Sequence, residues 1–356
     1  MATLSAYPSA MCFSSDVADI VFSGVASESA VLQLYATCGG NRLTLLDETV
    51  YRSGDGSVTV GGLSSLLEPY ARQYLRLTLD GSLQDSAGTV LIPSVTVLFS
   101  AADVGTTAAD FTANHFLTTL NGTKLTAPGR NERVYAYGLA AGGGVTVKGE
   151  ILTAVGQLQT LTASLTAASV AESISEFEVG PDNVAALLAV PTGARLLGYT
   201  VTAGSRVQDF EVLEDTLPPA PSLLFTNSFG CREFIHCVGT HRKESKYERK
   251  ATRVFGRLRS YRVLEDRQFT ANTGWLNEAM ADWADELLRS QEIYLWVNGS
   301  VGREVVITDS KSEISNEDDN MPAFELTYGY AQRIHNVMQP TRAGRIFDNT
   351  FDRTFN

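Results

Sequence analysis

The chain is poor in the residues from which disulfide frameworks and many active sites are built. It has four cysteines and four histidines among 356 residues. So few cysteines at this length do not indicate a fold held together by disulfides. No apolar run approaches the roughly 18 residues that a membrane-spanning helix needs. The first fifteen residues lack the basic stretch and apolar core of a secretory signal. The sequence therefore predicts neither membrane insertion nor secretion.

Positive charge is also scarce, with 28 Lys+Arg against 40 Asp+Glu and a net charge of −12. The deficit lies in residues 1–220, which hold 10 Lys+Arg against 21 Asp+Glu, whereas residues 221–356 hold 18 against 19. A broad nucleic-acid surface needs clustered Lys and Arg, so specific nucleic-acid binding is not predicted.

One basic stretch, HRKESKYERKATRVFGRLRSYR, begins at His241. Half of it is expected to be strand, where Arg253, Arg257 and Arg259 would line one face. Its charges alternate with glutamates, and it has little aromatic interleaving. A solvated face or an intersubunit salt-bridge face is therefore expected, and these three arginines are candidate subunit-interface residues.

No group of residues in the chain matches a catalytic, cofactor or metal site. Cys231 and Cys237 lie near His236 and His241, but zinc knuckles place their cysteines closer together and repeat the pair. No histidine accompanies a G-x-S-x-G turn. The carboxylates of SNEDDN, residues 315–320, fit a solvated hairpin turn better than a glycosidase pair. The sequence predicts a protein that is not an enzyme and that needs no cofactor or metal.

The first 216 residues consist of short alternating runs separated by turn residues, the pattern of β-sandwiches. We predict one β-sandwich domain over residues 1–104 and a second over residues 105–216. GGLSSLLEPY in the first and DFTANHFLTTL in the second are expected to be helical. LPPAPS at 217–222 is the expected linker, because proline removes backbone donors and favours extended chain.

The two predicted sandwiches contain a similar phrase. VTVGGLSSLLEPYARQYLRLTLDG in the first resembles FEVGPDNVAALLAVPTGARLLGYTVTAG in the second. Each has a strand that ends in glycine, a short Leu-rich helical turn and a long alternating strand. Either one sandwich unit is duplicated, or two β-meanders have converged on one composition.

Residues 223–339 combine alternating strands with one amphipathic helix, expected between Asn272 and Ser290. Strands alternate because successive side chains point to opposite faces. The helix presents one apolar stripe and one acidic side that is expected to face water. The stripe consists of Leu276, Met280, Trp283 and Leu287, and the acidic side of Glu278, Asp282, Asp285 and Glu286.

Residues 340–356 form a terminal arm in which Phe347, Phe351 and Phe355 recur every four residues. The segment is too short to fold alone. Exposed phenylalanines on a free tail reduce solubility unless another surface covers them. Docking on a neighbouring subunit is the favoured interpretation, and folding back onto the same chain is the alternative.

The C-terminal part resembles the sheet-plus-helix unit of tailed-phage tail tubes and of the distal tail proteins that cap them. The matching pieces are RVFGRLRSYRVLEDRQFTANTGWLNEAMADWADELLRSQEIYLWVNG, REVVITDSKSEISNEDDNMPAFELTYGYAQ and the terminal arm. The ending PTRAGRIFDNTFDRTFN resembles the endings of uncharacterised phage and prophage proteins.

The resemblance implies sheets packed on one helix and closure into a ring, usually a hexamer. Distal tail proteins usually carry the ring domain first, whereas here the β-domains come first, so the position in the tail stays open.

The fold class expected is therefore mostly β, with tandem β-sandwich domains followed by an α+β tail-tube-like domain. The expected function is that of a structural virion protein of a phage tail or baseplate, assembled in the host cytoplasm with other tail proteins. The alternative is a carbohydrate- or receptor-binding β-sandwich adhesin that contacts host-surface glycans.

Overall fold

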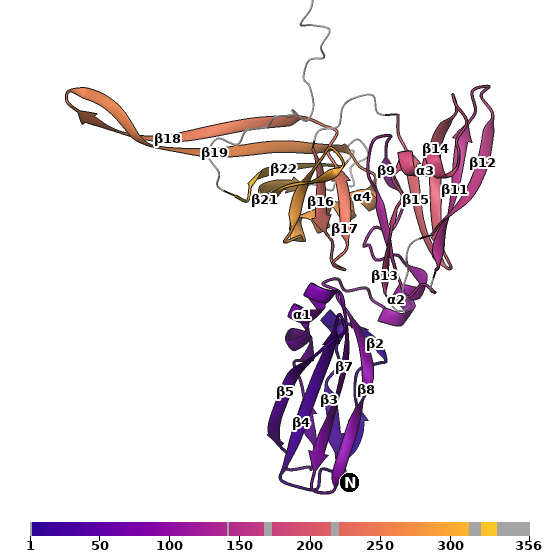
Figure 1. Cartoon of the computed structure of the whole chain (residues 1–356), viewed down its shortest axis with the longest axis vertical. Helices are drawn as coiled ribbons and strands as arrows, with labels where there is room; N and C mark the ends of the chain where they lie inside the picture. Colours follow the sequence, from indigo (N-terminus) through magenta and orange to yellow (C-terminus); the bar gives the residue numbers. More distant parts are fainter. Residues whose placement is uncertain (1, 141, 167–172, 215–220, 313–321, 333–356) are drawn as a thin grey trace, which may run out of the picture.

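The structure is a computed structural model, and it describes residues 2–140, 142–166, 173–214, 221–312 and 322–332. Three β-rich units follow one another along the chain (Figure 1). The first unit lies at the bottom of the view, and the other two lie side by side above it. The mostly-β fold class that the sequence predicts is confirmed.

The first unit is a sandwich of two sheets. Its strands are β1 (Thr3–Ala6), β2 (Met11–Phe13), β3 (Ile20–Ser23), β4 (Ser29–Cys38), β5 (Asn41–Tyr51), β6 (Val58–Val60), β7 (Arg76–Asp85) and β8 (Gly88–Leu98), with a 3-10 turn at Ser14–Asp16. The sheets have the orders β2-β8-β7-β4-β5 and β1-β3-β6. Alternate residues of β4, such as Leu32 and Leu34, are buried with Phe22 of β3 in one core. Helix α1 (Leu63–Tyr74) adds Leu63 and Leu67 to that core.

The second unit is built in the same way. Its elements are α2 (Ala108–Asn114), β9 (Lys124–Thr126), β10 (Arg133–Tyr137), β11 (Gly144–Leu152), β12 (Leu158–Thr166), β13 (Ile174–Glu178), α3 (Pro181–Leu187), β14 (Arg195–Ala203) and β15 (Arg206–Val212). One sheet has the order β12-β11-β14-β15-β9, and β10 pairs with β13. Thr107 caps α2, because its hydroxyl accepts a hydrogen bond from the Asp110 N–H at 3.1 Å.

The first two units share one topology. The antiparallel order β5-β4-β7-β8 of the first corresponds to β12-β11-β14-β15 of the second. Each series is extended by a strand that runs parallel to its last member, β2 beside β8 and β9 beside β15. The antiparallel pairs β3–β6 and β10–β13 correspond as well, and α1 and α3 follow β6 and β13. This is the arrangement expected of two copies of one unit.

The third unit is one seven-stranded sheet with a helix on one face. Its elements are β16 (Ser222–Thr226), β17 (Arg232–His236), β18 (His241–Val254), β19 (Arg257–Trp275), α4 (Glu278–Arg289), β20 (Ile293–Val297), β21 (Ser300–Ser312) and β22 (Ala323–Tyr330). The strand order is β17-β16-β20-β21-β22-β19-β18. The core between α4 and the sheet contains Trp283, Leu287, Phe225, Phe269 and Leu326.

The predicted helix lies between Asn272 and Ser290 as expected, but one detail of it is wrong. The helix begins at Glu278, because β19 continues to Trp275 and the Asn277 Oδ1 accepts a hydrogen bond from the Met280 N–H at 2.8 Å. Glu286 does not face water, since it is 3% exposed. Its carboxylate accepts hydrogen bonds from the backbone N–H and the hydroxyl of Ser228, at 2.7 and 2.9 Å.

The predicted linker 217–222 is one residue too long, because Ser222 already belongs to β16. Pairing fixes it there, opposite His236 of β17 and Trp296 of β20. The predicted hairpin turn at 315–320 lies outside the described residues. Within the described ranges, no helix combines the length and the apolar character needed to cross a membrane.

Candidate functional site

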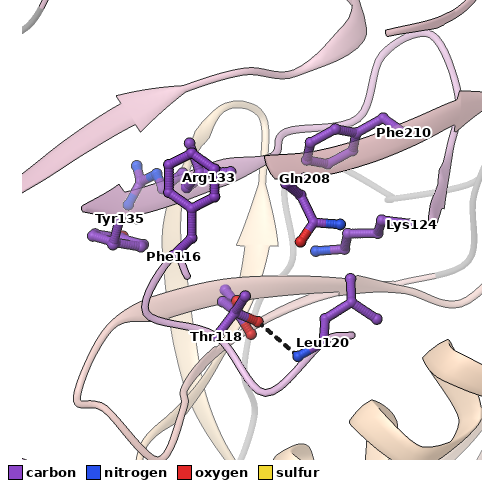
Figure 2. Close-up of a pocket in the computed structure, with 10 residues that line it drawn as sticks. Phe116, Thr118, Leu120, Lys124, Arg133, Tyr135, Gln208 and Phe210 are labelled. Carbon is purple, nitrogen blue, oxygen red and sulfur yellow. Dashed lines mark hydrogen bonds between the residues drawn. The ribbon is translucent and has the colours of Figure 1, made fainter. Parts of the chain in front are cut away.

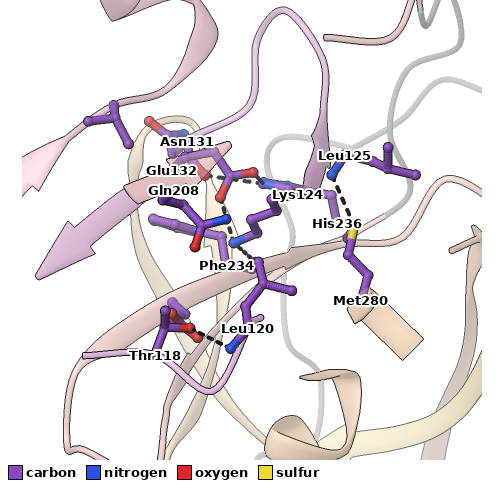
Figure 3. A network of polar contacts seen from close by, with 12 residues as sticks. Thr118, Leu120, Lys124, Leu125, Asn131, Glu132, Gln208, Phe234, His236 and Met280 are labelled. Atoms are coloured by element: carbon purple, nitrogen blue, oxygen red, sulfur yellow. Dashed lines mark hydrogen bonds and ion pairs between the residues drawn. The ribbon is translucent and has the colours of Figure 1, made fainter. Parts of the chain in front are cut away.

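A buried charged cluster lies where the second unit meets the third. Lys124 comes from β9, Glu132 directly precedes β10, and His236 ends β17. The Lys124 Nζ lies 2.7 Å from Glu132 Oε2, and His236 Nε2 lies 3.4 Å from Glu132 Oε1 (Figure 3). These side chains are 6%, 5% and 0% exposed for the lysine, the histidine and the glutamate. A charge taken out of water needs a partner, so the cluster ties the two units together.

Lys124 and His236 have further partners beside Glu132. The Lys124 ammonium donates a hydrogen bond to the Phe234 carbonyl at 3.1 Å and lies 4.4 Å from the centre of the Trp283 ring. His236 Nδ1 lies 2.7 Å from the Ser222 hydroxyl, and its Nε2 lies 3.2 Å from the Asn131 carbonyl oxygen. Both ring nitrogens are therefore occupied, which fixes the imidazole in place.

Two buried carboxyl groups in this region have opposite pKa shifts. Burial opposes ionisation of Glu132, but the nearby Lys124 and His236 outweigh it, so the pKa of Glu132 is lowered. Burial also dominates at Glu233 and raises its pKa, because Lys124 offsets that effect only in part. Glu233 Oε2 accepts a hydrogen bond from the Trp283 indole N–H at 2.7 Å. Glu132 is thus the counter-ion of Lys124, and Glu233 is the carboxyl group that keeps a proton to higher pH.

A small cavity adjoins the charged cluster (Figure 2). Its volume is about 10 Å³, and Phe116, Lys124, Tyr135, Gln208 and Glu233 are among its lining residues. Such a volume holds about one water molecule. A substrate or cofactor does not fit there. The cluster and its cavity therefore join two units rather than receive a ligand.

A second set of contacts joins all three units. Phe13 of the first unit, Tyr135 of the second and Phe229 of the third belong to one buried hydrophobic cluster. The Ala101 N–H donates a hydrogen bond to the Ser228 carbonyl at 2.7 Å, and the Tyr135 hydroxyl donates one to the Arg232 carbonyl at 3.0 Å. The junction is packed and hydrogen-bonded, so the third unit is held firmly against the other two.

The structure does not bring Cys231, Cys237, His236 and His241 together as metal ligands. Across the described part of the chain, no group of three or more His, Cys, Asp or Glu side chains could hold a metal ion. Cys231 and Cys237 are buried free thiols, and burial raises the pKa of Cys237 to about 12. His241 stacks on Phe269, with ring centres 6.0 Å apart.

The basic stretch forms a long two-stranded ribbon of β18 and β19 that projects from the third unit (Figure 1). We call residues 241–267 the arm. Residues 245–267 lie beyond the sheet, because β19 first pairs with β22 at Gln268, which is opposite Glu244 of β18. At about 3.3 Å per residue, residues 257–267 extend roughly 33 Å beyond the sheet. Within the described residues, β18 is an edge strand and this part of β19 pairs with β18 alone.

The charge of the arm is opposite to that of the rest of the chain. The arm holds 10 Lys+Arg and 4 Asp+Glu, which leaves 18 Lys+Arg and 36 Asp+Glu elsewhere, so the nets are +6 and −18. All four acidic residues lie in residues 241–248 and 264–267. The outer half of the arm, residues 249–263, therefore carries six cations and no acidic residue.

The prediction that Arg253, Arg257 and Arg259 share one face is wrong. Arg257 pairs with Val254 and Arg259 pairs with Thr252, whereas Arg253 pairs with Leu258. Cross-strand partners share a face. The turn occupies two residues, so odd positions of β19 lie opposite even positions of β18 between the turn and the register shift at Lys250 and Ala251. Arg257 and Arg259 are therefore on one face of the arm and Arg253 is on the other.

The arm also exposes apolar side chains. On the face that carries Arg253, Leu258 is 72% exposed, and Tyr247 and Val263 are about half exposed. Phe255 at the tip is 101% exposed. Exposed apolar side chains beside unpaired strand edges are features that soluble proteins usually cover. The arm is the strongest candidate interface in the described part of the molecule. Phe347, Phe351 and Phe355 lie outside that part.

Comparison with known proteins adds no family. No protein-family model matches the chain, and no curated protein matches it. Among solved structures, the chain is similar to one described as giving insight into host cell surface retention of a 1.5-MDa bacterial ice-binding adhesin. That match has a TM-score of 0.16 and 12% identity and covers 76% of this chain and 91% of that chain. A second match, to the plexin A4 full extracellular region, has a TM-score of 0.19 and 8% identity. It covers 95% of this chain and 37% of that chain. Such scores support no argument about fold or function.

Lys124, Glu132 and Glu233 were not predicted from the sequence as members of a buried cluster. A partial signal was present in β17, REFIH, where Glu233 is followed directly by Phe and Ile. A charged residue beside the apolar positions of a buried strand indicates a buried partner. Nothing in the sequence shows that the partners come from residues about a hundred positions earlier in the chain.

Proposed function

We propose that this protein is a structural component of a bacteriophage tail or baseplate and that it associates with copies of itself into a ring. The main support for this proposal comes from the properties of the arm. It extends roughly 33 Å from the sheet at strand spacing, its charge is opposite to that of the rest of the chain, and it exposes apolar side chains and unpaired strand edges. These properties suit a segment that another protein surface covers.

The placement of the arm suits a ring. In Figure 1 the arm leaves one side of the third unit, and the second unit lies on the other side. A contact between an arm and a different surface of the next copy is heterologous, and repeated heterologous contacts close into rings or continue as filaments. The resemblance to tail tubes favours a hexamer in the virion, assembled in the host cytoplasm with other tail proteins. The acidic body would pass DNA without holding it.

Shortening the arm tests this proposal. Ser245 and Arg267 are cross-strand partners, so residues 246–266 can be replaced by an Asn-Gly turn that joins them. We expect full-length protein to sediment as a closed oligomer and the shortened variant to sediment as a monomer with unchanged thermal stability. A full-length protein that stays monomeric at every concentration would refute self-assembly. An unchanged oligomer in the shortened variant would refute the role of the arm.

The second candidate function is a carbohydrate- or receptor-binding adhesin. Tyr51, which ends β5 at the sheet edge of the first unit, is 76% exposed, and Tyr7 is 47% exposed. Exposed aromatic rings are the usual platforms for sugars. Binding of full-length protein to a glycan array that Tyr51→Ala abolishes would support this function. The two functions are compatible in one protein.

A further inference from the structure

We infer that the outer half of the arm docks on the exposed acidic face of α4 of a neighbouring copy. The inference rests on the proposed self-association and names the two surfaces that meet. Two observations support the inference. The arm and α4 carry unpaired charges of opposite sign, and the two surfaces lie in separate places within one copy.

The outer half of the arm has cations without partners. Arg253, Arg257, Arg259 and Arg262 make no ion pair with any described residue. The inner half differs, because its acidic residues lie beside its own cations. Lys246 lies 4.0 Å from Glu244, for example. The arm is therefore neutralised where it leaves the sheet and strongly basic where it ends.

The outer face of α4 carries the matching charge. Glu278, Asp282 and Asp285 follow one another at spacings of four and three, so they form one stripe. Glu278 and Asp282 are exposed and Asp285 is half-buried, and none of the three forms an ion pair within the described ranges. Like charges at this spacing destabilise a helix. A cation from outside the chain's own fold would remove that cost.

Apolar side chains flank this acidic stripe. Trp275, just before the helix, is 75% exposed, and Leu288 near its end is 36% exposed. The arm offers Phe255 at its tip and Leu258 beside Arg253. Both surfaces thus combine unpaired charge with exposed apolar groups. A protein surface can cover these apolar groups, whereas a phosphate backbone leaves them in water.

The arm does not reach α4 of its own copy. In Figure 1 the tip of the arm lies on one side of the third unit, and α4 lies near β9 of the second unit. The Asn277 side chain at the start of α4 donates a hydrogen bond to the Thr123 carbonyl at 2.7 Å, which fixes that position. The two surfaces therefore meet only between copies. When such a contact repeats head-to-tail from copy to copy, it closes into a ring or continues as a filament.

Charge reversal tests the contact. The arm variant is Arg253→Glu, Arg257→Glu and Arg259→Glu, and the helix variant is Glu278→Lys, Asp282→Lys and Asp285→Lys. Each variant alone should raise the apparent dissociation constant of the assembly by at least about tenfold at low salt, and the two combined in one chain should restore it. The control for the helix variant has Glu48, Glu150 and Glu211 changed to lysine. It changes the net charge by the same amount as the helix variant, but at exposed sites on the first two units. It should assemble like the wild type.

Disulfide trapping provides a second readout. The four native cysteines are buried, so engineered surface cysteines react selectively. Mixing an Arg253→Cys protein with an Asp282→Cys protein should give a disulfide-linked pair, because Arg253 lies on the face of the arm that carries Leu258. Mixing the Arg253→Cys protein with a Glu150→Cys protein should not.

The outcomes separate this inference from the proposed function. A wild-type monomer would refute both. If the wild type assembles through the arm but the helix variant behaves like the control, self-assembly stands and the α4 contact is wrong. If the arm variant assembles normally but loses binding to duplex DNA in the same buffer, the arm is a nucleic-acid site and the inference is overturned.

Discussion

Replacing Glu132 by glutamine should weaken the junction between the second and third units. The change keeps the shape of the side chain but removes the charge that lies 2.7 Å from the Lys124 ammonium. Lys124 then stays buried without its main counter-ion. Removing one partner of a buried ion pair costs about 3–5 kcal/mol. We expect the free energy of unfolding at neutral pH to fall by that amount.

Glu233→Gln is the matched control, because Glu233 is also buried and also lies near Lys124, yet its pKa shift has the opposite sign. The lowered pKa of Glu132 means that its contribution to stability is present above its ordinary value of 4.5 and is lost as the pH falls through the folded-state pKa. The raised pKa of Glu233 means that its contribution is present below 4.5 and is lost as the pH rises through the folded-state pKa. Glu233→Gln should therefore gain stability relative to wild type as the pH rises.

The assay is urea unfolding at several pH values, followed by tryptophan fluorescence, since Trp283 lies within this region. Glu132→Gln should show its largest loss at neutral pH and a smaller loss in acid. Equal losses for Glu132→Gln and Glu233→Gln, or a loss below about 1 kcal/mol for Glu132→Gln, would refute the assignment of Glu132 as the counter-ion.

Three further predictions concern the helix cap, a close strand contact and the terminal arm. Asn277→Ala removes the cap of α4 and its hydrogen bond to the second unit, so thermal unfolding should show a loss of about 1–2 kcal/mol. In Gly81→Ala the new Cβ would overlap the carbonyl oxygen of Gln33, so urea unfolding should show a loss of about 1–3 kcal/mol or more, whereas Gly54→Ala, with open space around it, should stay within about 0.5 kcal/mol of wild type. Deleting residues 341–356 should weaken assembly in light scattering, and a fully assembled deletion variant would refute docking of the phenylalanines.

The parts of the fold that depend on local pattern were predictable from sequence. Strand β4 alternates buried and exposed residues as its sequence indicates, because strand geometry imposes that period wherever one face is buried. The apolar stripe of α4 was predictable because helix geometry places residues three and four positions apart on one face, and Trp283 and Leu287 are buried as expected. The sequence did not show where between Asn272 and Ser290 the helix begins, because its start depends on the tertiary pairing that extends β19 to Trp275.

The buried cluster and the arm depend on tertiary structure and were less accessible. Lys124 and His236 are distant in sequence and meet through Glu132 only after the second and third units pack together. The arm was predicted as a basic strand segment, but its projection from the sheet depends on where β22 stops pairing with β19. The face on which Arg253 lies depends on the length of the turn.

The mass of the purified full-length protein in solution shows whether the protein associates with copies of itself. Light scattering with negative-stain images of the same sample gives both the mass and the shape. We predict closed rings, with six copies favoured. A monomer at every concentration, with no ring in the images, would contradict the account.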